Sequence, residues 1–436
     1  MKISLITLGT RGDLQPFVAL GLGLQGAGYE VQVVSARNDA AFVRGYGLAH
    51  YALNVDIEQL MNGPAAQEMV RSNTPIKFIR SHLRGTAALK HTMRAALEEI
   101  WTACQGADAL VYHPGMANGY FMARQLGIPG IMASPFPLTA TADYPAILFY
   151  AGPRLGRWYN RATHFVFERA FWLMTRGAIK AFWDARPGQQ PVPLTPATTL
   201  QLASGQPLLG AYSEAFFPRP ADWPAHALVT GGWVLPPPAA WTPPAALVTF
   251  LAAGPPPVYL GFGSMKDPAQ FRQTLRVLVR AAGLAGQRAV VALGWNTLDA
   301  LEPGEALPPT VYLLDSAPHA WLFPRVAAVV HHGGAGTTYA GLAAGRPTVV
   351  VPHATDQPGW GRRVFELGAG PAPIPKKQLT AERLAAALTQ ALAPAVAQQA
   401  ARLGERLRQE DGVGTAVRVV DRLLKSGSFE ALPVAP

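Results

Sequence analysis

Short apolar runs alternate with longer amphipathic stretches throughout the first half of the chain. Runs of this length, rich in aliphatic and β-branched residues, are typical of buried strands, and the stretches between them have helical spacing. The predicted strands lie at residues 3–8, 31–34, 109–112 and 130–132. Because strands that alternate with helices form parallel sheets covered on both faces, the first half predicts an α/β domain.

The same alternation resumes in the second half, after a segment rich in proline and tryptophan. This segment contains FPRPADWPAHALVTGGWVLPPPAAWTPP, which cannot form one regular element. Strands are predicted after it at residues 257–262, 289–293, 311–314, 327–330 and 347–351. We therefore expect two doubly wound domains, at residues 1–217 and 257–408, joined by a linker region at 218–256 and followed by a C-terminal helix and tail at 409–436.

Composition and charge fit a globular protein with an anionic partner. The chain has 436 residues, of which 49% are hydrophobic and 15% charged, and its formal net charge is +10. The basic residues are scattered and form no tract interleaved with aromatic residues, so we expect no nucleic-acid binding. Attraction to an anionic membrane is the alternative. Cys104 is the only cysteine, which excludes an intramolecular disulfide and a cysteine-based metal site.

The hydropathy pattern predicts no membrane-spanning segment. No uninterrupted apolar run reaches the roughly eighteen residues that cross a bilayer, and the apolar run at the start of the chain is shorter than a signal peptide requires. We therefore expect a cytoplasmic protein that is soluble or lies peripherally at the inner face of the membrane. The sequence does not predict an oligomeric state.

A glycine-rich turn, VVHHGGAGTT at residues 329–338, follows a predicted strand and precedes a helical stretch at 339–344. Glycines allow backbone N–H groups to approach a ligand closely, and a helix start adds partial positive charge, which favours an anion such as phosphate. The two histidines and two threonines add side-chain donors. A tight turn without a ligand is the alternative. Neither the lysine of a Walker loop nor the G-x-G-x-x-G spacing of dinucleotide-binding turns is present.

One strand later, the segment PHATDQP at residues 352–358 also follows a predicted strand. Asp356 and Gln357 offer acceptors and donors that suit the hydroxyl groups of a sugar. A capped helix start is the alternative explanation of the same residues. Because ligands bind at the carboxyl ends of strands in open α/β sheets, the neighbouring phosphate-type turn favours the sugar site.

Three motifs resemble those of a known family. HHGGAGTT, DQPGWGRR and TRGDLQP are similar to segments of the nucleotide-sugar glycosyltransferases of the GT-B fold, which include plant, antibiotic and sterol glucosyltransferases. VYHPGMANGYFMARQLGIPGI, SPFPLT and AYSEAFFPRPADWPAHALVTGGW resemble the sterol enzymes in particular. The resemblance implies two Rossmann-like, doubly wound parallel-sheet domains that face a cleft, the first for the acceptor and the second for the donor. It also implies a final helix that returns to the first domain, for which residues 415–424 are the candidate.

The resemblance implies roles for individual residues of the second domain. His332 would contact the donor's phosphates with the glycines and threonine that follow it, and Ser264 would also face them. The nucleotide base would lie near Ala317 and His319, and the sugar near Asp356 and Gln357. Gly359 stands where an aromatic residue is common in the family. The implied donor-binding residues are Ser264, Ala317, His319, His332, Gly333, Gly334, Gly336, Thr337, Asp356 and Gln357.

The TRGDLQP turn, which lies between the predicted strand at 3–8 and a predicted helix at 17–25, carries the implied catalytic base. Many relatives have G-H-x-x-P at this place, with the histidine as general base, whereas this chain has Asp13 there, as sterol and some antibiotic glycosyltransferases do. His113, directly after the predicted strand at 109–112, would partner Asp13 or orient the acceptor. The alternatives are that Asp13 is a helix N-cap and that His113 is structural.

The resemblance implies an inverting transferase that moves glucose from UDP-glucose, a co-substrate, to a hydroxyl of a sterol-like or other bulky apolar acceptor. No Asp-x-Asp sequence occurs, so we predict no metal and no cofactor, with the leaving-group charge met by the helix start after His332. The aromatic and basic run at residues 160–183 is expected to shape the acceptor pocket or to lie on a membrane, with ordinary core helices as the alternative. The alternatives are a TDP- or UDP-deoxysugar transferase acting on a polyketide or peptide, and a catalytically silent nucleotide- or lipid-binding protein.

Overall fold

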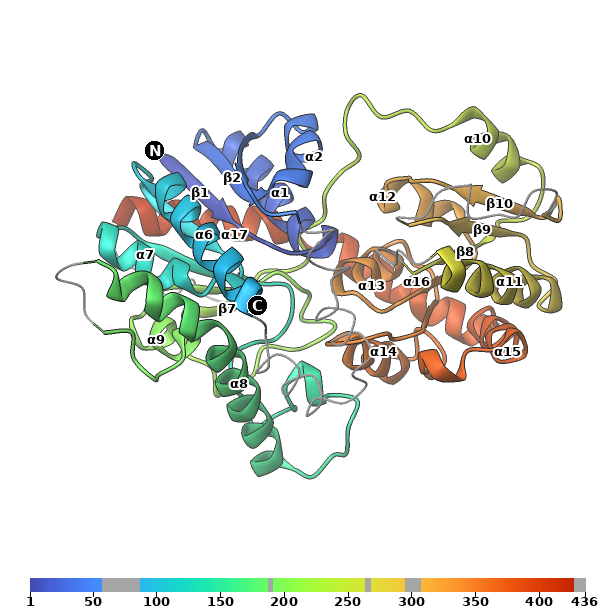
Figure 1. The fold of residues 1–436 in the computed structure, drawn as a ribbon. Helices are drawn as coiled ribbons and strands as arrows, with labels where there is room; N and C mark the ends of the chain where they lie inside the picture. The colour runs from blue at the N-terminus through green and yellow to red at the C-terminus, as the bar shows by residue number, and fades with distance from the viewer. Residues whose placement is uncertain (57–86, 187–190, 263–267, 295–306, 427–436) are drawn as a thin grey trace. The chain divides into compact units, whose positions relative to one another are not determined.

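The computed structural model describes residues 1–56, 87–186, 191–262, 268–294 and 307–426 (Figure 1). The chain divides into two compact units. The first unit contains Met1–Leu235 and the segment that starts at Glu410, and the second contains Pro236–Gln409. The division lies inside the range 218–256, predicted as a linker region, and this range also includes a strand of the first unit and a helix of the second.

A seven-stranded, entirely parallel sheet forms the centre of the first unit, with the strand order β3-β2-β1-β4-β5-β6-β7. The strands are β1 Lys2–Ile6, β2 Glu30–Ala36, β3 Ala49–Leu53, β4 Ala109–Tyr112, β5 Gly130–Ser134, β6 Leu208–Gly210 and β7 Ala227–Val229. Strands β1, β2, β4 and β5 are those that the sequence predicts, because burial on both faces makes them nearly continuous apolar runs. The other three were missed because they are short or carry polar residues such as His50.

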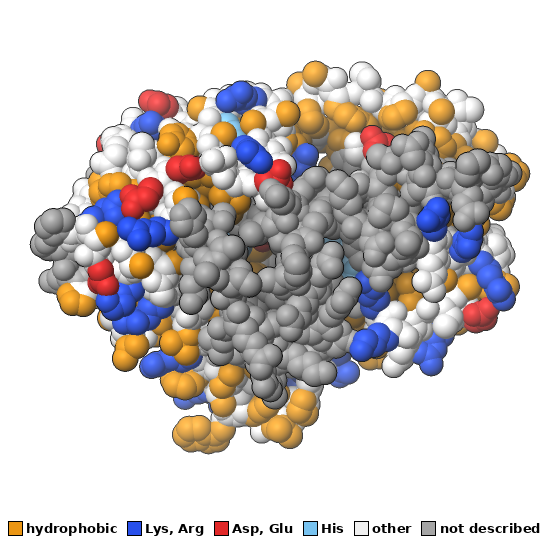
Figure 2. Space-filling view, viewed as in Figure 1, with side chains coloured by type: hydrophobic (Ala, Val, Ile, Leu, Met, Phe, Trp, Pro, Cys, Tyr) orange, Lys and Arg blue, Asp and Glu red, His pale blue; other side chains and the backbone are white. Residues whose placement is uncertain are grey.

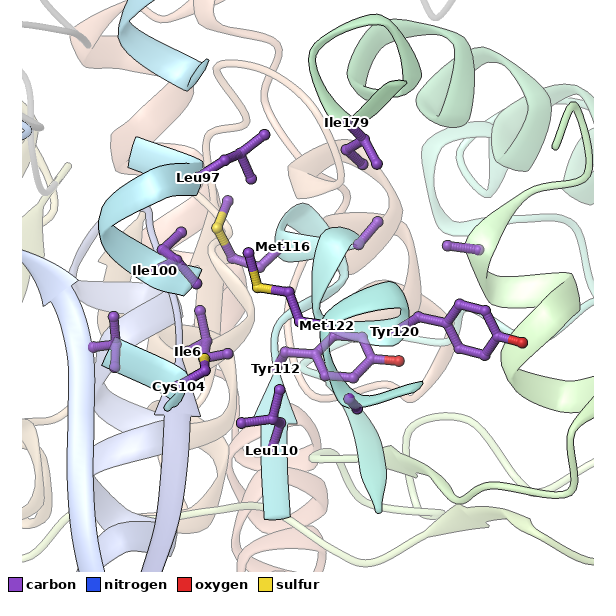
Figure 3. Packing of buried hydrophobic residues seen from close by; sticks show 14 of the residues in the cluster. Ile6, Leu97, Ile100, Cys104, Leu110, Tyr112, Met116, Tyr120, Met122 and Ile179 are labelled. Carbon is purple, nitrogen blue, oxygen red and sulfur yellow. The ribbon is translucent and has the colours of Figure 1, made fainter. Parts of the chain in front are cut away.

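Helices cover both faces of this sheet. They are α1 Arg11–Gly26, α2 Ala40–Gly45, α6 Ala87–Cys104, α7 Asn118–Leu126, α8 Arg157–Asp184, α9 Ala197–Ala203 and α17 Gly412–Ser426. One apolar cluster lies under α6, α7 and α8, as Figure 3 shows in part, and another lies under α1 and α17. The helix expected at residues 415–424 is part of α17. It packs closely on α1, where Gly23 leaves room for the side chains of Val413 and Val417.

The second unit has a five-stranded parallel sheet with the strand order β10-β9-β8-β11-β12. Its strands are β8 Val258–Gly261, β9 Ala289–Ala292, β10 Val311–Leu314, β11 Val329–His331 and β12 Thr348–Val350. Its helices are α10 Ala245–Ala252, α11 Pro268–Leu284, α12 His319–Leu322, α13 Ala335–Ala343, α14 Gln357–Glu366, α15 Ala381–Ala391 and α16 Pro394–Arg408. The sequence predicts all five strands to within two residues at either end, and the expectation of two parallel-sheet α/β domains is confirmed.

The described helices include no candidate for a membrane span. No helix in that part of the chain is both long enough and apolar enough to cross a bilayer.

Candidate active site

The TRGDLQP segment forms the turn from β1 into α1, and the helix begins earlier than the sequence predicts. The predicted helix starts at residue 17, after Pro16, whereas α1 starts at Arg11 and contains Pro16. Thr10 is the N-cap: its hydroxyl accepts a hydrogen bond from the Gly12 N–H, and its own N–H donates to the Asp13 carboxylate. This capping box stabilises the first helical turn and explains the early start.

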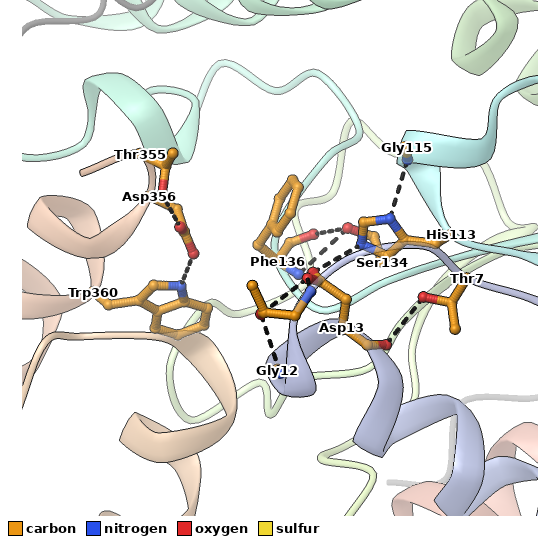
Figure 4. A network of polar contacts seen from close by, with 11 residues as sticks. Thr7, Gly12, Asp13, His113, Gly115, Ser134, Phe136, Thr355, Asp356 and Trp360 are labelled. Atoms are coloured by element: carbon orange, nitrogen blue, oxygen red, sulfur yellow. Dashed lines mark hydrogen bonds and ion pairs between the residues drawn. The ribbon is translucent and has the colours of Figure 1, made fainter. Parts of the chain in front are cut away.

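The Asp13 carboxylate is contacted at both of its oxygens (Figure 4). Oδ2 accepts hydrogen bonds from the Thr10 N–H at 2.7 Å and the Thr10 hydroxyl at 3.2 Å, and Oδ1 lies 3.6 Å from Nε2 of His113. A Cβ atom at Gly9 would lie 2.3 Å from Oδ2, so this glycine leaves the space that the carboxylate fills. Asp13 is therefore the third helical residue of the box and not the N-cap. With 30% of its side chain exposed, it can be reached by a ligand.

His113 follows β4, and sheet pairing brings it beside the end of β1, where Ile6 is opposite Tyr112. Its Nδ1 accepts a hydrogen bond from the Gly115 N–H at 3.1 Å. A neutral imidazole with an accepting Nδ1 carries its proton on Nε2, the atom that faces Asp13. Burial lowers the pKa of His113, and the nearby Asp13 opposes this shift without reversing it. The pair is thus a neutral imidazole that points its N–H toward a carboxylate.

An apolar cavity of about 20 Å³, room for about one water molecule, lies at the same edge of this sheet. Ile6 at the end of β1 and Gly115 beside His113 both line it, together with residues of α6, α7 and α8. Asn118 is a buried polar residue in the lining. Its Oδ1 accepts a hydrogen bond from the Trp183 indole at 2.7 Å, which leaves the Nδ2 amino group without a partner in the described part of the chain.

The glycine-rich turn of the second unit connects β11 to α13. His331 ends the strand and α13 starts at Ala335, four residues before the predicted helix. His331 is fully buried, and its Nδ1 accepts a hydrogen bond from the Gly333 N–H at 2.8 Å. Gly333 has a φ of 92°, and a Cβ atom there would lie 2.6 Å from Val350 Cγ1. His331 therefore shapes the turn, which corrects the expectation that both histidines offer donors to a ligand.

The first turn of α13 lacks a carboxylate. Its N-cap, Gly334, has no side chain to accept from the free N–H groups, and no acidic residue follows within the turn. The Thr338 hydroxyl is buried and donates to the Gly334 carbonyl at 2.9 Å, so of the two threonines only Thr337 is placed for a ligand. A Cβ atom at Gly336 would lie more than 4 Å from the other atoms of the described residues, apart from its own helix and chain neighbours. This open helix start suits an anion.

Four histidines gather around this turn and all are held neutral by burial. The His332 ring centroid is 6.0 Å from that of His331 and 6.3 Å from that of His353. Burial lowers the pKa of His332 and His319 to about 4 and that of His353 to about 3, and it also lowers the pKa of His331. Uncharged His332 can donate a hydrogen bond to a phosphate oxygen without bringing a second charge into the site.

The PHATDQP segment connects β12 to α14 (Figure 4). Asp356 occupies the N-cap position, but its carboxylate caps nothing: Oδ1 accepts from the Thr355 hydroxyl at 2.8 Å and Oδ2 from the Trp360 indole at 2.9 Å. Gln357 uses its Oε1 to accept from the N–H groups of His353 and Ala354. Trp360 is 2% exposed and therefore fixes the orientation of the Asp356 carboxylate. The capped-helix alternative is thus wrong for the Asp356 side chain.

The remaining expected donor residues lie around α12 and β8. The half-buried His319 ring stacks on Phe323, with centroids 4.3 Å apart and planes at 13°, and meets the edge of Tyr259. Ala317 is half-buried just before the helix. Ser264 lies outside the described residues. Among the residues that are described, no group of three or more His, Cys, Asp or Glu side chains is arranged to hold a metal ion.

Sequence reasoning missed several residues of these sites. His353 belongs to the histidine group, Trp360 orients Asp356, and Asn118 brings an amide into the apolar cavity. For His353 a signal existed, because it follows a predicted strand within PHATDQP. Trp360 and Asn118 also lie within the motifs DQPGWGRR and VYHPGMANGYFMARQLGIPGI, but residue type alone gave neither of them a role.

Solved structures identify the fold. The glycosyltransferase of kitacinnamycin has a TM-score of 0.67 at 23% identity, covering 97% of this chain and 99% of that one. SnogD from Streptomyces nogalater has a TM-score of 0.65 at 21% identity, covering 97% of this chain and all of that one. Both are glycosyltransferases with this architecture, so the chain has the GT-B fold.

Sequence comparison then identifies the family. The model of the glycosyltransferase family 28 N-terminal domain matches residues 3–145, and that of the erythromycin biosynthesis protein CIII-like C-terminal domain matches residues 278–416. A sterol 3-beta-glucosyltransferase of Arabidopsis thaliana is 33% identical over 97% of this chain and 68% of its own length. That of Emericella nidulans is 33% identical over 98% of this chain but only 30% of its own length. The chain belongs to the glycosyltransferase family that contains these sterol 3-beta-glucosyltransferases.

Proposed function

We propose that this protein transfers glucose from UDP-glucose to the hydroxyl group of a sterol or another bulky apolar alcohol, with inversion at the anomeric carbon. The observation that carries the proposal is the partly exposed Asp13 carboxylate, faced by the neutral imidazole of His113 and placed at the sheet edge that also holds an apolar cavity. The similarity to the plant and fungal sterol 3-beta-glucosyltransferases supports glucose and sterol as the substrates.

Asp13 is the general base of this reaction. The acceptor hydroxyl gives its proton to the carboxylate while its oxygen attacks the anomeric carbon, and the bond from that carbon to the diphosphate breaks, so that UDP leaves with the electron pair. His113 positions the carboxylate through its Nε2–H. A carboxylate is a weak base for an alcohol, and an apolar acceptor strengthens it by excluding water.

The acceptor binds in the first unit at the apolar cavity beside His113. The cavity has room for only about one water molecule, so α6 and α8 must separate to admit a sterol. The Asn118 amino group, which lacks a partner in the described chain, then donates to a polar group of the acceptor. The apolar lining and this single amide favour an acceptor that is apolar and has few polar groups.

The donor binds in the second unit at the start of α13. The uncapped N–H groups and the neutral His332 donate to the diphosphate and stabilise the charge that develops on it as UDP leaves. Asp356 and Gln357 bind the sugar hydroxyls, and His319 with Ala317 borders the base. Because these groups can meet the charge of the diphosphate without a metal ion, we propose that the reaction proceeds in the presence of a chelator.

The test is release of UDP from UDP-glucose by the purified protein, with EDTA present and with a panel of sterols and other apolar alcohols. Acceptor-dependent release together with a glucosylated product by mass spectrometry is the expected result. Turnover of TDP-sugars alone would support the deoxysugar transferase instead, and nucleotide binding without turnover of any donor would support a silent binding protein. Loss of activity in EDTA, restored by Mg²⁺, would contradict metal independence.

The proposed acceptor partitions into lipid, so the enzyme has to meet it at a membrane surface. We accordingly propose a cytoplasmic enzyme with peripheral membrane contact.

A further inference from the structure

The first half of α8 carries large apolar side chains on its exposed surface as well as on its buried one. Leu155, just before the helix, is 67% exposed, Trp158 is 87% exposed, Phe165 58% and Leu173 54%. Figure 2 shows hydrophobic side chains at the lower edge of the view, where Figure 1 shows the start of α8. Other exposed large hydrophobic residues of the described chain, such as Leu284 and Phe365, are far apart in the sequence, as is normal on a protein surface.

The exposed apolar residues form one face of the helix. Trp158 and Phe165 are two turns apart, and Leu173 follows two turns later, while Val166 lies at its margin and is 45% exposed. We call Leu155, Trp158, Phe165, Val166 and Leu173 the apolar face of α8.

The helix start is anchored, so the apolar face has a fixed orientation on the first unit. Asn160 donates through Nδ2 to the Ala142 carbonyl at 2.8 Å, and the Thr163 hydroxyl accepts from the Ala146 N–H at 2.9 Å. Nε2 of the buried His164 lies 3.1 Å from the Tyr144 carbonyl. These buried polar contacts hold the opposite side of the helix, which keeps the apolar face turned outward.

Arginines near the apolar face outnumber the carboxylates there by four to three. Between residues 154 and 173 the sequence has four arginines and a single acidic residue, Glu168, which accepts a hydrogen bond from the Thr199 hydroxyl. Arg169 lies over the Phe165 ring at 4.9 Å. Carboxylates from neighbouring segments reach two of the other arginines, since Arg157 is 3.6 Å from Asp143 and Arg161 is 3.3 Å from Asp222. An excess of positive charge remains, as in the whole chain with its net charge of +10.

We propose that the apolar face of α8 docks on an anionic lipid bilayer. Exposed tryptophan, phenylalanine and leucine side chains insert at the headgroup level, and the arginines contact lipid phosphates while their aliphatic stems cover apolar surface. The excess of positive charge makes a bilayer with anionic headgroups a better partner than a neutral one. This inference rests on the proposed function, since docking brings the first unit to the phase in which an apolar acceptor is dissolved.

Co-sedimentation with vesicles tests the docking without any activity measurement. The full chain is mixed with vesicles of phosphatidylcholine alone or with phosphatidylglycerol added. We compare the unchanged chain with the triple variant Trp158→Ser/Phe165→Ser/Leu173→Ser. The matched control is Val248→Ser/Leu284→Ser/Phe365→Ser, which removes three exposed apolar side chains of the second unit, 43%, 56% and 41% exposed.

The expected result is binding to anionic vesicles that weakens with added salt. The triple variant should bind at least about tenfold more weakly, since withdrawing one large apolar side chain from a lipid phase alone costs roughly that factor, and the control should bind as the unchanged chain does. A blue shift of tryptophan emission on vesicle binding should be smaller in Trp158→Phe. Equal binding by the triple variant, or equal binding to neutral vesicles, would overturn the proposal, and so would a dimer in size-exclusion chromatography that the triple variant dissociates.

Activity measurements separate this inference from the proposed reaction. With the acceptor in detergent micelles, the triple variant should release UDP as fast as the unchanged chain, and with the acceptor in anionic vesicles it should be slower by the factor lost in binding. If no acceptor reacts in either form, the proposed transfer fails while the vesicle result still decides the docking surface.

Discussion

The turns that start α1 and α13 share one architecture, but only the first has a side-chain N-cap and a carboxylate. Each follows a buried parallel strand, passes through glycine and opens a helix at the carboxyl edge of its sheet. In the first turn the Asp13 carboxylate accepts from the Thr10 N–H. In the second turn no acidic residue is present and the N-cap is Gly334, so the first N–H groups keep their capacity for a ligand.

A histidine lies beside or within each turn, and its Nδ1 accepts a hydrogen bond from the N–H of the glycine two residues later. His113, which follows β4 and faces the first turn, accepts from Gly115, and His331, in the second turn, accepts from Gly333. In both cases the ring is neutral and presents Nε2–H, but only the first ring has a carboxylate to face. A helix start with its own carboxylate can take up a proton, whereas one without a carboxylate can receive an anion. The residue at the third helical position therefore decides whether the helix start takes up a proton or binds an anion.

Asp13→Asn is expected to have the largest effect and would break the comparison at the first turn. The amide can still accept from the Thr10 N–H, so the helix start should persist, but it cannot take a proton. We expect kcat to fall by about 10²- to 10⁴-fold, the usual contribution of a general base, with UDP affinity unchanged. Steady-state kinetics and UDP titration calorimetry measure the two quantities. Asp184→Asn, an exposed carboxylate on α8, serves as the control, and retained kcat in Asp13→Asn would exclude the base.

His332→Ala tests the second turn. Loss of one hydrogen bond to a charged group should weaken UDP binding by about 10- to 100-fold, and the protein should remain folded because His332 is only half-buried. Calorimetric titration with UDP gives the affinity. His226→Ala, a half-buried histidine of the first unit, should bind UDP normally. If His332→Ala also binds UDP normally, the phosphates lie elsewhere.

Gly9→Ala and Gly12→Ala form a matched pair within the first turn. A Cβ atom at Gly9 would lie 2.3 Å from Asp13 Oδ2 and must displace the carboxylate, whereas at Gly12 its nearest neighbour would be the Thr10 hydroxyl at 3.5 Å. We expect kcat to fall by about tenfold for Gly9→Ala, because small displacements of a catalytic group are costly, and by much less for Gly12→Ala. Equal kcat values for the two variants would show that the carboxylate position is unimportant.

Gly336→Ala tests whether the diphosphate binds in the open space at the start of α13. The added methyl group meets no atom of the described residues within 4 Å, so the helix should become more stable by about 0.5–1 kcal/mol. A diphosphate bound there would meet the methyl group, and UDP affinity should fall several-fold. Thermal unfolding and calorimetry measure these opposite effects. A more stable protein with unchanged UDP affinity would place the ligand away from Gly336.

The smallest expected effect is a pH dependence of stability from the histidines of the second unit. Burial lowers the pKa of His319 and His332 to about 4, whereas an unfolded histidine titrates near ~6.5. As pH falls from 6.5 to 4, the unfolded chain takes up protons that the folded chain does not, so the free energy of unfolding decreases. His319→Phe should reduce the accompanying fall in Tm by a few degrees. If the Tm of His319→Phe falls with decreasing pH as steeply as that of the unchanged chain, the His319 ring is not held neutral.

Prediction from sequence succeeded where short-range patterns decide the structure. The five strands of the second sheet are mostly apolar and were predicted within two residues, whereas β7 was missed because it lies in the segment rich in proline and tryptophan. The start of α1 was predicted six residues too late, because Pro16 signals a boundary more strongly in the sequence than the capping box of Thr10 and Asp13 does.

The sequence by itself determined two parallel α/β domains, the places where their strands end and the residue types at those ends, because burial period and turn chemistry are local properties. Only the tertiary structure decided that His113 faces Asp13 with its Nε2–H, that His331 shapes its turn while His332 stays available, and that Trp360 orients Asp356. Asp13 and His113 are a hundred residues apart and meet because β1 pairs with β4, and a ring's proton position follows from the hydrogen bond it accepts. Strand pairing and the competition for hydrogen-bond donors are settled across the whole fold, and no short segment carries them.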